Sequence, residues 1–236
     1  MINSKFTYRS SGIEIMDDLN CSGEVVHQTL RELEIINRML GGNAVTVQGV
    51  LSLLKEKSQI PIQVIDLGCG GGDMVLLLKR KFEKSNIKAT FKGIDANPNI
   101  VAYASSHAHT EPGVSFEALD ILSNDFRNQS CDVALATLFF HHFTNDQLVD
   151  ILSHLKNQCR IGFVINDLHR HPFAYYSIEL LTRLFSKSNM VKNDGPLSVL
   201  RGFLKKELIT ILARAEIKSY TIKWMWAFRW QVIVKI

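Results

Sequence analysis

A cluster of glycines after a short apolar segment constrains the fold of this chain more than any other feature. Residues 62–66 read Ile-Gln-Val-Ile-Asp, and residues 68–72 read Gly-Cys-Gly-Gly-Gly. Apolar residues at helical spacing then run from 74 to 82. A strand, a glycine turn and a helix in this order predict the first unit of an α/β nucleotide-binding fold. The glycines let the backbone turn close to a ligand, and the start of the helix offers free N–H groups.

The glycine spacing does not fit the dinucleotide fingerprint, which requires Gly-x-Gly-x-x-Gly or Ala. The third position of that fingerprint falls on Asp73 when counting begins at Gly68, and on Val75 when it begins at Gly70. An aspartate at a helix N-terminus is also a poor neighbour for a pyrophosphate. We therefore expect that NAD(P) does not bind, and that the cofactor carries cationic groups near Asp73.

Six further apolar segments predict the rest of an open sheet. Strands are expected at residues 89–94, 114–119, 131–140, 160–166, 217–224 and 230–236. The last two follow one another without a helix, so they should form an antiparallel hairpin at one edge. The predicted fold class is therefore α/β: a Rossmann-like, seven-stranded mixed sheet with five parallel strands, an antiparallel terminal hairpin and a helical N-terminal extension.

The segment before the sheet is mostly helical in pattern. One amphipathic helix is expected at residues 22–40, ended by two glycines, and a second at residues 45–57. This pattern predicts two parts, an N-terminal helical extension or cap over residues 1–60 and the main domain over residues 61–236.

A second candidate cap is an insertion in the main domain at about residues 173–203. Residues 173–186 should form an aromatic-rich helix, and residues 188–196 a polar loop with an Asn-Asp-Gly turn. The aromatic and aliphatic side chains of this segment suit a flat, apolar substrate. They would serve equally well as the core of a packed helix.

Polar residues follow the predicted strands at the edge where ligands bind in open α/β sheets. Asp95 ends the second strand, where this fold places an acid on ribose hydroxyls, and Asp120 follows the third strand. His141 and His142 follow the fourth strand, and Thr144-Asn-Asp-Gln147 then forms a capping-box pattern. Each of the two acids could instead be an ordinary turn residue.

The run from Asp66 to Gly72, together with Asp95, resembles the first motifs of class I S-adenosylmethionine (SAM) methyltransferases. A glycine loop by itself could also be only a tight turn. The resemblance covers roughly residues 60–236 and implies SAM as the cofactor, with the glycine loop around its amino-acid end. The cofactor-binding residues that it implies are Asp66, Gly68, Cys69, Gly70, Gly72, Asp95, Ala96, Asp120, Ile121 and Thr137.

Two narrower resemblances concern the subgroup. Phe140-His-His-Phe143 is similar to enzymes of the ubiquinone and menaquinone methyltransferase type. A more distant likeness, to methyltransferases encoded near type III polyketide synthases, implies phenolic lipids as substrates and a place in secondary metabolism. It rests on residues 15–18, 36–38, 167–170 and 193–195, together with Ser198-Val199.

The chemistry implied by this resemblance needs a base near neutral pH, because a phenol attacks the methyl of SAM well only as its anion. Histidine suits that role, and the candidates are His142 first, then His141 and His169. Because His141 and His142 are adjacent at a strand end, we expect them to point to opposite sides. Two alternatives remain open: a metal site formed with Asp167, which lacks zinc spacing, and histidines that only hydrogen-bond to loops.

Composition argues against several other classes of protein. The net charge of +4 is too small to indicate nucleic acid, and no Asn/Asp-Pro-Pro-Tyr/Phe motif follows the fourth strand. The apolar run at residues 133–140 is too short to span a bilayer, and the first 20 residues lack the apolar core of a signal peptide. The four cysteines are scattered without a C-x-x-C pair, which fits a reducing cytoplasm.

The sequence therefore predicts a cytoplasmic, SAM-dependent methyltransferase that acts on a small, apolar, phenolic or quinol-type acceptor, by O-methylation. No resident metal, nucleic acid or stable membrane insertion is expected, and the sequence does not predict an oligomeric state. The alternatives are a non-catalytic SAM-fold binding protein, a C- or N-methyltransferase of another small molecule, and a nucleic-acid methyltransferase.

Overall fold

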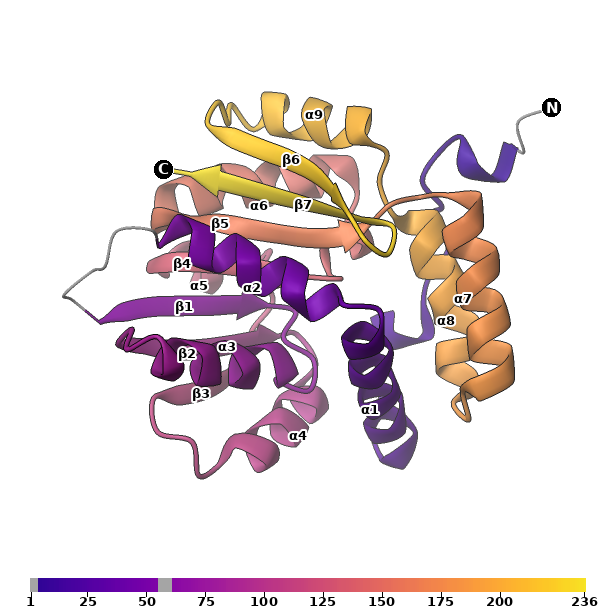
Figure 1. The fold of residues 1–236 in the computed structure, drawn as a ribbon, viewed down its shortest axis with the longest axis horizontal. Helices are drawn as coiled ribbons and strands as arrows, with labels where there is room; N and C mark the ends of the chain where they lie inside the picture. Colours follow the sequence, from indigo (N-terminus) through magenta and orange to yellow (C-terminus); the bar gives the residue numbers. More distant parts are fainter. Residues whose placement is uncertain (1–3, 55–60) are drawn as a thin grey trace.

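The computed structural model describes residues 4–54 and 61–236 of the chain. A seven-stranded sheet forms its centre, in the order β3-β2-β1-β4-β5-β7-β6, with helices on both faces (Figure 1). The strands are β1 (Ile62–Leu67), β2 (Ala89–Asp95), β3 (Val114–Ala118), β4 (Cys131–Thr137), β5 (Cys159–Leu168), β6 (Tyr220–Met225) and β7 (Arg229–Lys235). The α-helices are α1 (Glu24–Met39), α2 (Gly42–Leu53), α3 (Asp73–Lys84), α4 (Pro98–Ala108), α5 (Asn124–Arg127), α6 (Asn145–Gln158), α7 (Pro172–Phe185), α8 (Asn189–Arg201) and α9 (Lys205–Arg214).

The predicted fold class is confirmed. Strands β1 to β5 run parallel to one another, and β7 runs antiparallel to its neighbours β5 and β6. Val64 and Val133 face a core that α2 and α3 cover, whereas Ile65 and Ala134 face a core that α6 and α9 cover. Because adjacent residues of one strand enter different cores, both faces of the central strands are buried.

The fourth strand is shorter than the sequence predicted. It ends at Thr137 rather than residue 140. Leu138 then takes a left-handed conformation with φ 54°, and Phe140–His142 form a short 3-10 helix, η3. The capping box that follows is confirmed, since the Thr144 side chain accepts from the backbone N–H of Gln147 and the Gln147 side chain accepts from that of Thr144. The turn at Leu138 decides how the two histidines are oriented.

The prediction of a polar loop at residues 188–196 is wrong, because these residues belong to the start of α8 and its N-cap. The Ser188 hydroxyl accepts from the backbone N–H of Val191 and begins the helix. The Asp194 carboxylate accepts from the backbone N–H groups of Ile15 and Met16, at 2.9 and 3.1 Å. These contacts with a distant segment override the local turn preference of Asn-Asp-Gly.

The two N-terminal helices are close to their predicted positions. The first predicted helix corresponds to α1, and the second begins at Gly42 rather than residue 45. Its predicted last residues, 55–57, lie outside the described residues. Within residues 4–54 and 61–236, none of the helices has the length and apolar character needed to cross a membrane.

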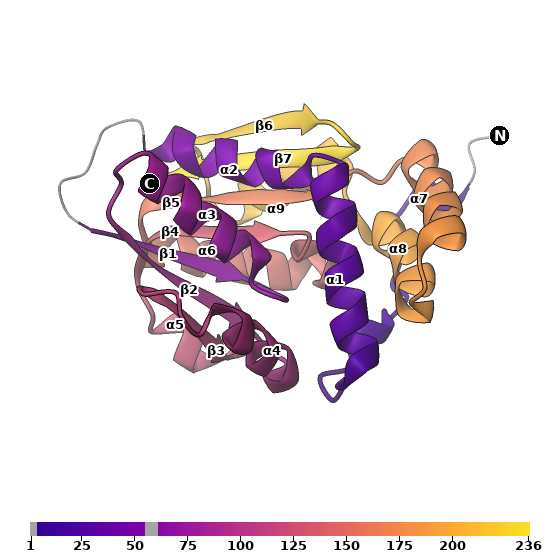
Figure 2. The same cartoon turned by 60° about the horizontal axis from the view of Figure 1, so that its bottom comes forward.

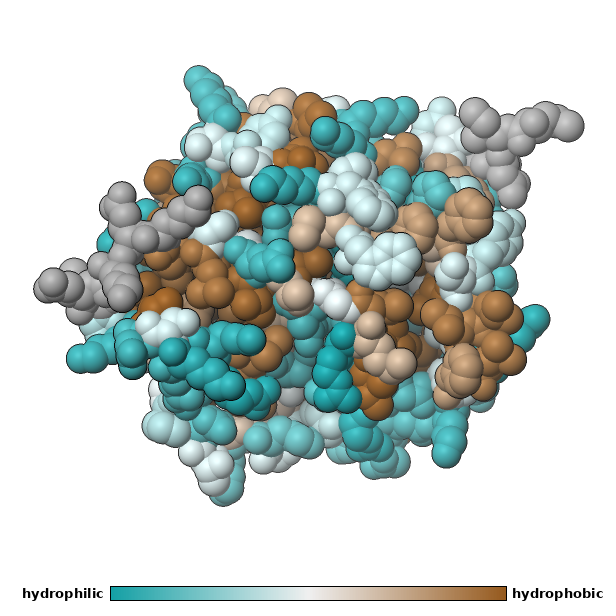
Figure 3. Space-filling model, viewed as in Figure 1, coloured by the Kyte–Doolittle hydropathy of each residue, from teal (hydrophilic) through white to brown (hydrophobic). Residues whose placement is uncertain are grey.

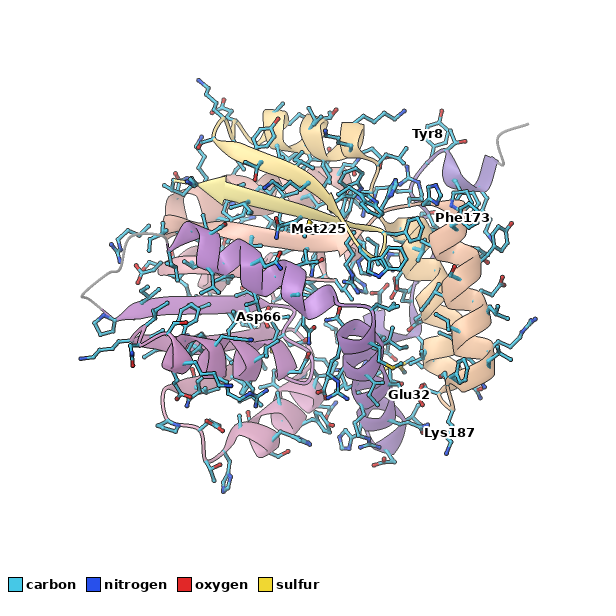
Figure 4. The ribbon with its side chains drawn as sticks, viewed as in Figure 1. Tyr8, Glu32, Asp66, Phe173, Lys187 and Met225 are labelled. Atoms are coloured by element: carbon cyan, nitrogen blue, oxygen red, sulfur yellow. The ribbon has the colours of Figure 1, made fainter. Side chains whose placement is uncertain are left out.

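The helices α1, α7 and α8 lie beyond the carboxyl ends of the parallel strands (Figure 2). A short 3-10 helix of the N-terminal segment, η2 (Ile15–Asp17), packs against α8. Hydrophobic side chains gather on the outer surface over α7 (Figure 3), where Leu180 and Leu184 are exposed. Phe173, at the start of α7, also points outward (Figure 4). The edge of the sheet that binds ligands in this fold is therefore covered by added helices.

Candidate active site

A cavity of about 1140 Å³ lies at the carboxyl edge of the sheet. It is lined by the ends of β1, β2 and β4, by α1, α7 and α8, by the N-terminal segment and by the turn between β6 and β7. Small-molecule sites usually enclose about 300–1,000 Å³, so this cavity has room for a cofactor and a second ligand.

The glycine loop and the end of β2 form one side of this cavity. Gly68 and Gly70 have positive φ angles of 66° and 50°, and a side chain at Gly68 would overlap the ring of Phe139. The Asp95 carboxylate accepts from the backbone N–H groups of Gly70, at 3.2 Å, and Asn97, at 3.0 Å. Asp95 therefore links the glycine loop to the start of α4, and it also lines the cavity.

Nine of the ten implied cofactor residues line the cavity. They are Asp66, Gly68, Cys69, Gly70, Asp95, Ala96, Asp120, Ile121 and Thr137. Gly72 does not line it. That residue is the left-handed N-cap of α3, with φ 80°, where a Cβ would lie 2.6 Å from the ring of Phe116. Gly72 thus shapes the turn without facing the ligand space.

Carboxyl groups are concentrated on the cofactor side. Burial raises the pKa of Asp66 well above its ordinary value, and the charges of Asp73 and Asp95 raise it further. Burial, with the charge of Glu34, raises the pKa of Asp73 to about 6, and burial also raises the pKa of Asp95. Figure 4 marks Asp66 near the centre of the molecule. Asp66 is buried and the other two acids are partly buried, and carboxyl groups so close together form a site that a cationic ligand would stabilise.

The two adjacent histidines face the same region, so the prediction that they point to opposite sides is wrong. They belong to the 3-10 helix η3 rather than to an extended strand, and their ring centroids are 4.3 Å apart. The Nδ1 atom of His141 lies 2.7 Å from Asp167 Oδ1, and that of His142 lies 2.6 Å from Asp17 Oδ1. Each carboxylate leaves the Nε2 atom of its imidazole free for other contacts.

Glu14 lies opposite these free nitrogens. Its Oε1 atom is 3.7 Å from His141 Nε2, and its Oε2 atom is 4.0 Å from His142 Nε2. Oε1 is buried without a hydrogen-bond partner among the described residues, and Ser198 donates to Oε2 at 2.9 Å. Burial raises the pKa of Glu14 to about 7, whereas the charges of His142 and Arg201 act in the opposite direction.

Arg201 of α8 holds this group of side chains together. It donates to the Asp17 carboxylate at 2.5 Å and to the backbone carbonyl of His142 at 2.8 Å. Burial raises the pKa of Asp17, but hydrogen bonds from His142 and Arg201 outweigh it, so the pKa falls below its ordinary value.. Sequence reasoning did not assign Glu14, Asp17 or Arg201 to the site, although Asp17 lies within the motif at residues 15–18. The three residues meet only through packing of the N-terminal segment against α8.

The structure does not bring His169 to this group. His169 does not line the cavity, and its ring packs against Trp230 and His171 at centroid distances of 5.0 and 5.3 Å. Burial lowers its pKa to about 4, and the charges of His171 and Arg170 add to this effect. Its position after β5, rather than after the turn at Leu138, therefore removes it from the candidate bases.

Three of these side chains have the arrangement of possible metal ligands. One ligand atom each of Glu14, His141 and His142 lies within 4.8 Å of the other two. The guanidinium Nη1 of Arg201 is 3.6 Å from Glu14 Oε1, and its positive charge opposes a cation at this position. The geometry therefore favours a neutral or anionic oxygen between these residues.

Comparison with known proteins agrees with this architecture. Residues 64–162 match a family model described as a methyltransferase domain. A search of the curated proteins found no match.

Several solved structures have the same fold. The plantazolicin methyltransferase BpumL, in complex with SAH, has a TM-score of 0.65 at 18% identity, over 89% of this chain and 88% of that chain. Human N-acetylserotonin methyltransferase, in complex with SAM, has a TM-score of 0.63 at 17% identity, over 90% of this chain and 56% of that chain. A SAM-dependent methyltransferase from Aquifex aeolicus has a TM-score of 0.60 at 17% identity, over 88% of this chain and 97% of that chain.

At these identities the structural likeness establishes the fold. Together with the matched domain, and with SAM or SAH in the similar structures, it supports a SAM-dependent methyltransferase and SAM as the cofactor. The ubiquinone-like and polyketide-synthase-associated subgroups are not confirmed by these comparisons.

Proposed function

We propose that this protein transfers the methyl group of SAM to a hydroxyl oxygen of a planar, apolar acceptor of the phenol or quinol type. One observation carries the proposal. Two imidazoles, each held at Nδ1 by a carboxylate, lie in the same cavity as the glycine loop and Asp95.

The cofactor side of the proposal rests on charge and on shape. Gly68 and Gly70 leave room for the amino-acid end of the cofactor, and Asp95 offers acceptors for two ribose hydroxyls. Asp66 and Asp73, buried with raised pKa values, suit the ammonium and sulfonium charges. Asp120 and Ile121 follow β3 and line the cavity, where the adenine edge would be held.

The acceptor side needs orientation and removal of a proton. SAM, when bound, supplies an electrophilic methyl group that reacts by in-line displacement. His142 Nε2 takes the proton of the acceptor hydroxyl, and Asp17 stabilises the imidazolium that results. His142 is favoured over His141 because both residues line the cavity and the His142 side chain is 22% exposed, against 3% for His141. His141, with Asp167, is the second candidate.

The added helices would form the cap over the acceptor. Residues 1–60 contribute α1 and the segment that carries Glu14 and Asp17, and residues 173–203 contribute α7 and α8. Ile36 of α1, Leu40 just after it, and Ile178 and Leu181 of α7 give this part of the cavity an apolar lining. An apolar lining with a few fixed polar groups suits a flat ring that carries one reacting hydroxyl.

The test is a transfer assay with a panel of phenols, quinols and aromatic amines, in which formation of SAH is measured for the wild type and for His142→Gln. His154→Gln is the control, because His154 lies on α6 and does not line the cavity. Loss of a general base should lower turnover by about 10²–10⁴-fold at neutral pH with SAM affinity unchanged, and rate should return at high pH, where the phenol ionises by itself.

Three results would contradict this account. Wild-type turnover in both His142→Gln and His141→Gln would place the base elsewhere. A new methyl group on carbon or nitrogen would remove the need for a base at this position. SAM binding without transfer to any member of the panel would favour a non-catalytic binding protein.

A further inference from the structure

Arg229 is a buried cation that the transfer chemistry does not use. It is the first residue of β7, next to Leu168 of β5 in the sheet register. Because β7 runs antiparallel to β5, the start of β7 lies at the carboxyl edge, and Arg229 lines the cavity. The residue is only 2% exposed.

The guanidinium of Arg229 has no partner in the part of the chain that the structure describes. Its Nε and Nη1 atoms are buried without a hydrogen-bond partner among the described residues. Burial lowers the pKa of Arg229 to about 10, and the charge of Asp167 acts in the opposite direction. A buried charge that no carboxylate contacts directly is costly, so an anionic ligand would stabilise it.

The surrounding backbone leaves space for this guanidinium. A Cβ at Gly42, the first residue of α2, would lie 2.5 Å from Arg229 Cζ and 2.6 Å from Nη2. The Asn37 side chain reaches the same place, and its Oδ1 atom is also buried without a partner. The junction of α1 and α2 is thus shaped around a guanidinium whose hydrogen-bonding capacity is unused.

The other two arginines of the cavity are already engaged. Arg201 donates to Asp17 and to the backbone carbonyls of His141 and His142. Arg9 donates to the backbone carbonyls of Arg201 and Phe143 and to the Asn145 side chain. Among the lining arginines in residues 4–54 and 61–236, Arg229 alone has a guanidinium that makes no hydrogen bond.

We propose that the guanidinium of Arg229 binds a carboxylate of the methyl acceptor. This inference rests on the proposed function and adds a second recognition element, at a distance from the reacting hydroxyl. Guanidinium and carboxylate match in shape and often pair through two parallel hydrogen bonds. The acceptor is therefore a hydroxyaromatic acid with an apolar ring.

The position in the sheet separates this site from the carboxylate of SAM itself. Three steps of the strand order lie between β1, which carries the glycine loop, and β7. Neighbouring strands are about 4.8 Å apart, so the two sites are about 14 Å apart across the sheet. That separation places Arg229 on the acceptor side.

The experiment compares two matched pairs of probes by calorimetry, with and without SAH. The pairs are 6-hydroxy-2-naphthoate with 2-naphthol, and 4-hydroxybenzoate with phenol. The proteins are the wild type, Arg229→Met, Arg229→Lys and, as a control, Arg160→Met, whose arginine is exposed and pairs with Asp132 outside the cavity. Thermal melting without ligand verifies that each variant folds, and removal of an unpaired buried charge should leave Arg229→Met at least as stable as the wild type.

We expect the wild type and Arg160→Met to bind the carboxylate member of at least one pair about 10–100-fold more tightly than its neutral partner. Arg229→Met should lose that preference, Arg229→Lys should keep part of it, and the affinity for SAH should stay the same in all four proteins.

A wild type without preference for either carboxylate would overturn the proposal, and so would a preference that persists in Arg229→Met. A loss of SAH affinity in Arg229→Met would assign the guanidinium to the carboxylate of the cofactor instead. If the wild type does not bind SAH, the proposed function fails, while the probe pairs measured without SAH still decide the role of Arg229.

Discussion

Replacement of Glu14 by glutamine should remove a pH-dependent cost of folding. Glu14 is 4% exposed, and its Oε1 atom has no hydrogen-bond partner among the described residues. Burial raises its pKa from 4.5 to about 7, against the charges of His142 and Arg201. A group whose pKa is higher in the folded than in the unfolded state contributes stability below its unfolded pKa, and this contribution is lost as the pH rises through the folded pKa.

The size of the effect follows from this displacement. A pKa raised from 4.5 to about 7 corresponds to a cost of about 3 kcal/mol at pH 8 but only about 1 kcal/mol at pH 5. Glutamine has the same shape, carries no charge and can still accept from Ser198. The free energy of unfolding of Glu14→Gln, relative to that of the wild type, should therefore rise by about 2 kcal/mol from pH 5 to pH 8.

Scanning calorimetry at pH 5 and pH 8 measures this gain. The melting temperature of Glu14→Gln minus that of the wild type should be about 4–8 °C larger at pH 8 than at pH 5. Glu216→Gln is the matched control, because the Glu216 side chain is 83% exposed. Other titrating groups, including Asp73, are present in both proteins, so their contributions cancel to first order. A stability difference that stays constant from pH 5 to pH 8 would refute the reasoning, because it would mean that the Glu14 carboxyl is not buried.

Two further predictions concern the cofactor side. Because burial and the charge of Glu34 raise the pKa of Asp73 to about 6, SAM affinity should rise with pH up to about 6 and then level off. The rise should be about tenfold for each unit by which SAM binding lowers this pKa. In calorimetry, Asp73→Asn should show no such dependence on pH, and a wild type whose SAM affinity does not change with pH would contradict this prediction. Gly68→Ala should cost about 1–3 kcal/mol more in urea unfolding than Gly113→Ala. Both glycines have positive φ, but a Cβ would lie 2.1 Å from the Phe139 ring at Gly68 and no closer than 3.7 Å to any atom at Gly113, so equal costs would contradict the close approach of Phe139.

The elements that could be predicted from the sequence are those with local causes. The strands alternate with helices at short spacing, and the capping box at Thr144 begins α6 as expected. Asn97 caps α4 through its side chain, with Pro98 in the first turn, and both residues are common at these positions. The glycine loop and Asp95 could also be predicted from the sequence, because local motifs determine where they lie.

The acceptor side of the cavity could not be predicted in the same way. Glu14 and Asp17 meet Arg201 across more than 180 residues of chain, and no local pattern records that contact. The orientation of His141 and His142 depends on the left-handed turn at Leu138, which an apolar run does not reveal. The sequence around Asp194 favours a turn locally, and only its hydrogen bonds to the N-terminal segment explain the helix α8.

The central claim is that the chain binds SAM between the glycine loop and Asp95, and calorimetric titration of SAM into Asp95→Ala tests it most directly. Asp146→Ala is the control, because that aspartate is exposed on α6. Loss of two hydroxyl contacts to a carboxylate predicts about 2–4 kcal/mol weaker binding in Asp95→Ala, with wild-type affinity in Asp146→Ala. Wild-type affinity for SAM in Asp95→Ala, or no binding of SAM by the unmodified protein, would contradict the account.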